Sequence, residues 1–221
     1  MSETTAEQVL ARQWAAYAAQ SAASAEGDGT DPEVRARLVA LYGEPDSYEE
    51  IVAPFADGWP GLAPARALPW DADPDVLAAH VLADVREAQK RRTKEYERDL
   101  KHGVVGARPA FALERPHRAA EAAVLLDRPD VAGLFPYDGA ELTAVLASWE
   151  ERFGTRLVGL DHETVILSVA APPCTTQEAE RVAAEHFAFS SDTIVQEEDE
   201  ILSAYAANQL VADPVWRFWW D

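Results

Sequence analysis

The sequence predicts an α+β protein in which helices pack on one face of an antiparallel sheet, after an N-terminal unit that is mostly helical. Three observations support this prediction. Apolar residues recur at helical spacing through most of the first hundred residues. Two segments near 156–170 alternate between apolar and polar residues as strands do, and the sequence ends in an aromatic segment with a high β propensity. Strands and helices in the order found after residue 107 are typical of an elaborated ferredoxin-like unit.

Residues 1–106 form the predicted N-terminal unit. Apolar residues recur at helical spacing in three stretches, 5–25, 31–43 and 75–102. In the second stretch, one side of the helix is formed by Val34, Leu38 and Leu41. Residues 54–70 are rich in proline and glycine but also contain Trp59, so we expect an irregular segment that lies on a surface of the fold.

The second half of the longest predicted helix is basic. Residues 86–101 hold seven of the nineteen lysines and arginines, interleaved with acidic side chains. Such a pattern is typical of a solvated helix whose last turns complement the helix dipole. Because Lys90, Arg91 and Arg92 stand out in an acidic molecule, a specific docking site is the alternative.

Residues 107–221 form the predicted α+β domain. Its expected elements are a strand at 110–113, helices at 118–126 and 138–153, a hairpin of strands at 156–160 and 164–170, a helix capped by Thr175 or Thr176, a helix at 199–210 and a closing strand.

The closing strand is expected to be buried, because exposing so many aromatic rings at a terminus would leave a large apolar patch. Alternation places one set of side chains on the helix-covered face, Trp216, Phe218 and Trp220. The opposite face receives Val215, Arg217 and Trp219. Two interpretations of this second face stay open: the N-terminal unit covers it, with the proline-rich segment moulded onto Trp219, or part of it joins Trp59 in a groove for a partner protein or ligand.

Composition restricts the class of partner. The 221 residues carry a formal charge of -20, which disfavours nucleic acid and anionic membranes as partners. The acidic excess serves solubility, or it captures a basic protein. The single cysteine, Cys174, and the acidic, polar start lead us to expect a cytoplasmic protein; the oligomeric state is not predicted.

No stretch of the chain matches a known catalytic, metal-binding or cofactor-binding motif, so we expect no cofactor, no metal and no assigned catalytic residue. His186, beside Glu185, is the nearest approach to an acid/base site, although a histidine on the apolar side of a helix is more often a packed core residue. The favoured hypothesis is a non-enzymatic interaction or binding protein. The alternative is an enzyme of unrecognised class that uses His186 with Glu185 or Asp192. Five residues are candidates for a binding site: Trp59, His186, Asp192, Arg217 and Trp219.

Four sequence blocks resemble a bacterial domain of unknown function, DUF4253, over residues 107–221. These blocks are 148–154 (SWEERFG), 167–173 (LSVAAPP), 183–189 (AAEHFAF) and 216–221 (WRFWWD). The family has no established activity, so the resemblance implies no mechanism. This chain departs from the family pattern at Ser190-Ser191-Asp192, where Cys-Pro-Asp is usual, and at the hairpin turn Asp161-His162-Glu163. If the family uses a thiol at the position of Ser190, this chain lacks it.

Overall fold

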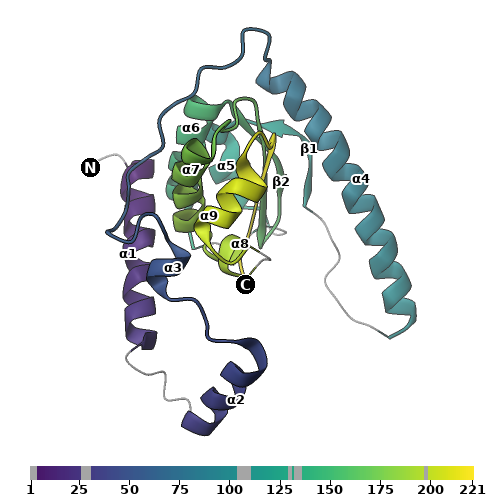
Figure 1. Cartoon of the computed structure of the whole chain (residues 1–221). Helices are drawn as coiled ribbons and strands as arrows, with labels where there is room; N and C mark the ends of the chain where they lie inside the picture. The colour runs from purple at the N-terminus through teal and green to yellow at the C-terminus, as the bar shows by residue number, and fades with distance from the viewer. Residues whose placement is uncertain (1–3, 26–30, 104–110, 129–130, 132–135, 197–198) are drawn as a thin grey trace.

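The computed structural model in Figure 1 describes residues 4–25, 31–103, 111–128, 131, 136–196 and 199–221. The predicted α+β class is confirmed, because helices surround a four-stranded antiparallel sheet and the N-terminal part is helical. The helices are α1 (Ala6–Ala25), α2 (Pro32–Tyr42), α3 (Tyr48–Ile51), α4 (Pro74–Lys101), η1 (Ala119–Glu121), α5 (Ala122–Leu126), α6 (Gly139–Phe153), α7 (Thr176–Phe189), α8 (Asp192–Val195), α9 (Leu202–Tyr205) and η2 (Ala206–Leu210). The strands are β1 (Ala112–His117), β2 (Thr155–Leu160), β3 (Thr164–Val169) and β4 (Val215–Trp219).

Helix α6 shows how local sequence sets the element boundaries. The Asp138 carboxylate accepts hydrogen bonds from the first turn, and the Glu141 carboxylate accepts one from the Asp138 N–H, which completes a capping box. At the other end, Gly154 adopts a φ of 65°, a left-handed conformation that glycine adopts most easily. Helices α3 and α8 were not predicted, since a four-residue helix is too short to show a hydrophobic period.

The sheet order corrects the ferredoxin-like expectation. The elements after residue 107 do follow a β-α-β-β-α-β order, but the strands pair in the order β1-β2-β3-β4 and every neighbouring pair is antiparallel. A split βαβ arrangement would insert a strand between two parallel ones. Here each connection, whether it holds helices or the turn between β2 and β3, places the next strand beside the preceding one. The sheet is therefore a meander and β4 lies at one edge.

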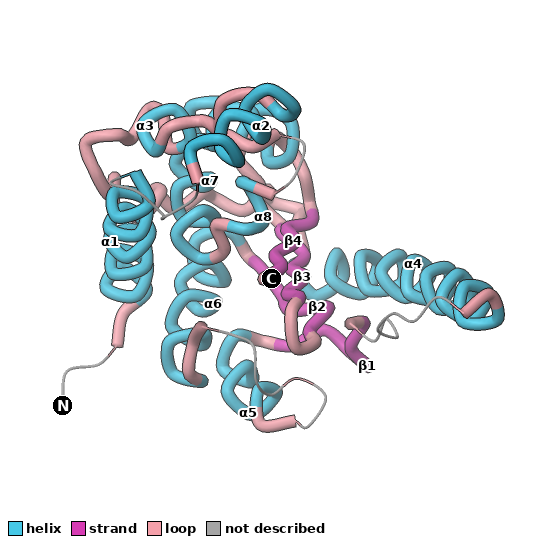
Figure 2. Tube along the Cα trace, turned by 90° about the horizontal axis from the view of Figure 1, so that it is seen from below, coloured by secondary structure: helices cyan, strands magenta, loops and turns pink. Residues whose placement is uncertain are grey.

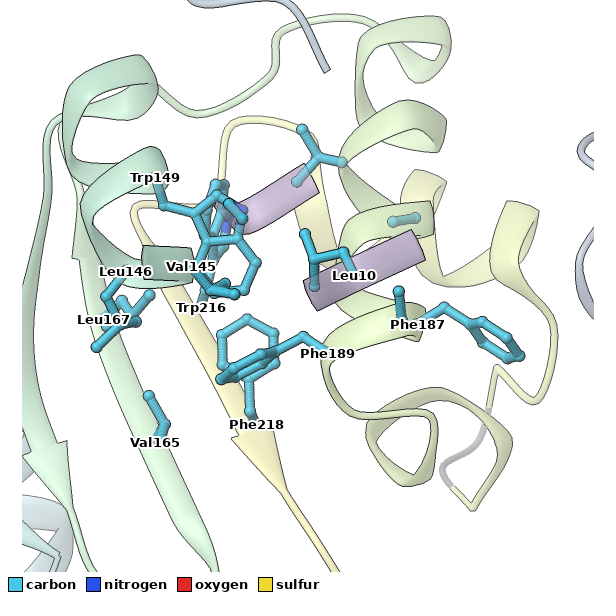
Figure 3. Packing of buried hydrophobic residues seen from close by; sticks show 14 of the residues in the cluster. Leu10, Val145, Leu146, Trp149, Val165, Leu167, Phe187, Phe189, Trp216 and Phe218 are labelled. Atoms are coloured by element: carbon cyan, nitrogen blue, oxygen red, sulfur yellow. The ribbon is translucent and has the colours of Figure 1, made fainter. Parts of the chain in front are cut away.

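Figure 2 shows how the layers are arranged. Helices α6 and α1 lie on one side of the sheet and α4 lies on the other. The face towards α6 and α7 holds the main core, in which Trp149 stacks on Phe218 with ring centroids 5.2 Å apart (Figure 3). On the opposite face, α4 buries Val81, Leu82 and Val85 against the sheet.

The boundary proposed between residues 106 and 107 lies outside the described residues. What the structure shows is that the two predicted parts share one core. Leu10 of α1 is fully buried between α6 and α7 (Figure 3). Trp14 of the same helix meets Phe187 edge-on, with ring centroids 5.3 Å apart. Both α1 and α4 therefore serve as layers on the α+β domain.

Candidate functional site: a groove between α4 and β4

A groove of about 570 Å³ opens between α4 and the edge strand β4. It forms because α4 packs mainly on β1, β2 and β3, so its apolar side ends before β4 is covered. The lining residues come from α4, the segment at Phe111, the hairpin and β4: Val81, Asp84, Val85, Ala88, Arg91, Arg92, Phe111, Glu163, Thr164, Ile166, Val215, Arg217, Phe218 and Trp219. Its base is apolar and its rim is charged, and several rim side chains are exposed to solvent.

Alternate side chains of β4 point into the groove. Trp216 and Phe218 are buried in the main core, at 1% and 0% exposure, as predicted. Val215, Arg217 and Trp219 therefore point to the α4 side. The antiparallel register with β3 places Arg217 opposite Ile166 and Trp219 opposite Thr164, which sets the groove along the length of the strand.

Two hydroxyl groups anchor the end of β4. Thr193 Oγ1 accepts a hydrogen bond from the Trp219 N–H at 3.0 Å, and Ser190 Oγ donates one to the Trp219 carbonyl. Ser190 stands where the resemblance in the sequence leads to an expectation of cysteine, and in this chain its hydroxyl holds the groove strand to the end of α7. The position has a structural task here that requires no thiol.

The charge of the groove differs from that of the whole molecule. The lining holds three arginines, Arg91 and Arg92 on α4 and Arg217 on β4, and two carboxylates, those of Asp84 and Glu163. The groove thus has a formal excess of one positive charge, whereas the chain carries -20. The Arg92 guanidinium lies 5.8 Å from the ring centroid of Phe111, within the range of a cation–π contact. Of the three basic residues singled out in the sequence, Arg91 and Arg92 line the groove, and Lys90 pairs with Glu87 at 2.6 Å.

Trp59 lies far from Trp219 in the fold. Its Nε1 donates to Glu7 Oε1 at 2.7 Å, and its ring lies 5.8 Å from that of Trp14. The proline-rich segment thus packs along α1, α6 and α7, on the main-core side of the sheet. The N-terminal unit does cover part of that face of the sheet, through α4. The expectation that the proline-rich segment moulds onto Trp219 was wrong, and so was a groove that Trp59 shares, because Trp59 packs against α1.

His186 is a core residue in this structure. It is fully buried, its Nδ1 lies 3.0 Å from the Tyr205 hydroxyl, and its ring meets Trp216 and Phe218 edge-on, each at 4.6 Å. Burial lowers the pKa of His186 well below the usual range, so the ring is neutral at pH 7. Asp192, the carboxylate considered as its partner, accepts a hydrogen bond from the Asp221 N–H instead.

Glu185 belongs to a buried ion pair that the sequence did not reveal. Each carboxylate oxygen of Glu185 accepts one hydrogen bond from Arg152, at 2.7 and 2.6 Å. The same two oxygens also accept hydrogen bonds from the Trp149 Nε1–H and the Ala63 N–H. Because Ala63 lies in the proline-rich segment, this pair fastens that segment to α6 and α7. All four lone-pair directions of the Glu185 carboxylate accept hydrogen bonds from the protein, so no lone pair is free to act as an acid/base group on a substrate.

Among the residues that the structure describes, no three His, Cys, Asp or Glu side chains gather in a metal-binding cluster. In the same residues, no helix combines the length and the apolar character needed to cross a bilayer.

The comparisons with known proteins agree with the resemblance seen in the sequence. A family described as Domain of unknown function (DUF4253) matches residues 129–221, which contain α6, the β2–β3 hairpin, α7 and β4. The suspected family is thereby confirmed for the C-terminal part of the chain. No curated protein and no solved structure matches the chain.

Proposed function

We propose that this protein is a non-enzymatic binding module and that a segment of a partner protein docks in the groove between α4 and β4. The observation that carries the proposal is the incomplete cover of β4. On the other face α7 packs over this strand, whereas on the groove face Arg217 is exposed and Trp219 is only partly buried. A sheet edge with an apolar base and a charged rim is typical of a protein interface.

The chemistry of the groove supports a macromolecular partner. Its arginines and Trp219 are residue types that concentrate in interfaces. Asp84, Arg91, Arg92 and Arg217 are exposed, so the groove is accessible along its length and suits an extended or helical segment better than an enclosed small molecule. The proposal assigns Arg217 and Trp219 to the site, and the placement of Trp59, His186 and Asp192 supports structural tasks for them. A cytoplasmic location, proposed from the single cysteine, goes with this function.

A blocked groove provides the test. Ala88 is partly buried on α4 and lines the groove, so Ala88→Trp fills it from a helix that stays intact. A phage library of peptides is selected on the immobilised full chain, and selected peptides are then measured against the wild type and Ala88→Trp by fluorescence anisotropy. We expect at least a tenfold loss of affinity, about 1.4 kcal/mol, in the blocked variant.

Two controls make the result specific. Leu100→Trp changes an exposed residue of the same helix beyond the groove and should leave the affinity unchanged. Circular dichroism of both variants should show the helical content of the wild type. Peptides that bind Ala88→Trp as tightly as the wild type, or a library that yields no specific binder, would contradict the proposed function.

A further inference from the structure

Helix α2 carries an apolar stripe that its own chain leaves exposed. The stripe consists of Val34, Leu38 and Leu41, with exposed fractions of 48%, 49% and 70%. Their spacing of four and three residues puts them on one side of the helix. A stripe with this spacing is the usual anchor set of a helix that lies in a groove.

The groove lies beside α4, where the helical layer on this face of the sheet is incomplete. On the main-core face, α6 packs on β2, and α7 covers β4 with Phe189 at 4.9 Å from Phe218. On the groove face, α4 is the one helix against the sheet among the described residues (Figure 2). A second helix beside α4 would complete that layer.

The lengths of α2 and β4 match. The 11 residues of α2 span about 16 Å at the rise of an α-helix. The 5 residues of β4, which form one wall of the groove, span about 17 Å. The stripe of α2 can therefore lie against the groove over its whole length.

The charges of the two surfaces are also compatible. The groove has both signs, with Arg91, Arg92 and Arg217 near Asp84 and Glu163. Beside its stripe, α2 exposes the acid Glu33 and the base Arg37. A uniformly acidic or uniformly basic partner would meet like charges in the groove, whereas a helix with both signs can pair with both.

We propose, resting on the binding function given above, that the groove takes α2 of a second copy of this chain. In a two-fold symmetric dimer each subunit provides one stripe and one groove, so both exposed surfaces become buried by a single kind of contact. Each subunit carries -20, so the subunits repel at low ionic strength and the dimer strengthens as salt is added.

Light scattering after size exclusion measures the mass of the full chain and its variants. The wild type is expected at twice the chain mass of 24.2 kDa. Leu38→Glu/Leu41→Glu and Ala88→Trp are each expected at the monomer mass, because one breaks the stripe and the other blocks the groove. Val124→Glu changes another exposed apolar residue, on α5, and stays dimeric.

Mixing the two monomeric variants separates a lost interface from a lost fold. One variant keeps its groove and the other keeps its stripe, so together they form a heterodimer with one working contact. In a Cys174→Ser background, Leu38→Cys in one chain and Ala88→Cys in another should form an intermolecular disulfide, and Val124→Cys with Leu38→Cys should not.

Three results would overturn this inference: a monomeric wild type at 100 μM and 0.5 M salt, a dimer that persists in the stripe variant, or a disulfide that closes within one chain carrying both Leu38→Cys and Ala88→Cys. If the wild type is monomeric while Ala88→Trp still abolishes peptide binding, the second copy is excluded as the occupant and the binding function stands.

Discussion

Replacing Glu185 by glutamine tests the buried network that joins the proline-rich segment to the core. Glu185 has no exposed surface, and its oxygens accept hydrogen bonds from Arg152, Trp149 and Ala63. Glutamine preserves the volume, but its amide group must place an NH₂ against donors whichever way it is turned. The Arg152 guanidinium, with 10% of its side chain exposed, also loses the opposing charge.

The expected cost follows from breaking a buried ion pair by changing one partner, about 3–5 kcal/mol. Since single domains are stable by about 5–15 kcal/mol, this is a large part of the total. With a urea dependence of roughly 2 kcal/mol per molar, the midpoint should fall by about 1.5–2.5 M. Urea titrations followed by tryptophan fluorescence and far-ultraviolet circular dichroism measure this shift directly.

Two further variants define the comparison. Glu151→Gln removes an exposed carboxylate one residue from Arg152 and should change stability by at most about 0.5 kcal/mol. Arg152→Met/Glu185→Met removes both charges, so it should be less destabilised than Glu185→Gln. A Glu185→Gln midpoint within error of Glu151→Gln would refute the importance that we give to this network.

Three other predictions concern the core and the groove strand. Burial lowers the pKa of His186, so below the ordinary histidine pKa of about 6.5 the unfolded chain binds a proton that the folded chain does not. The free energy of unfolding should therefore fall from pH 6.5 towards pH 5, by up to about 1.4 kcal/mol per pH unit. Urea titrations at each pH measure this fall, and His186→Leu should lack it. Truncation after Val215 removes the buried rings of Trp216 and Phe218. Because losing one such ring costs about 3–5 kcal/mol, the truncated chain should show no cooperative thermal transition. A transition within a few degrees of that of the full chain would count against a buried strand. Trp219→Ala should leave the rate of limited proteolysis within residues 54–70 unchanged. Trp59→Ala loses the contacts with Glu7 and Trp14, so it should raise that rate. Equal rates in both variants would contradict the placement of Trp59.

The sequence alone determined the elements whose signals are local. The capping box at Asp138, the glycine that ends α6 and a threonine cap of α7 are contacts between residues within a few positions of each other, so they can be identified without a tertiary structure. The choice of Thr175 over Thr176 as that cap came from the structure. The two-residue period of β4 likewise assigned Trp216 and Phe218 to the core and Arg217 and Trp219 to the other face. The exposed stripe of α2 was visible as a helical period, although its exposure was not.

The tertiary structure decided which elements meet. Glu185 and Arg152 are 33 residues apart, and nothing near either one indicates the partner, so a glutamate beside a histidine resembled an acid/base pair. The meander order of the sheet depends on where the helical connections place β2 and β4, which the order of elements along the sequence leaves open. The groove exists because α4 lies over β1, β2 and β3 and stops before β4, and that position is fixed by packing between distant surfaces rather than by any local signal.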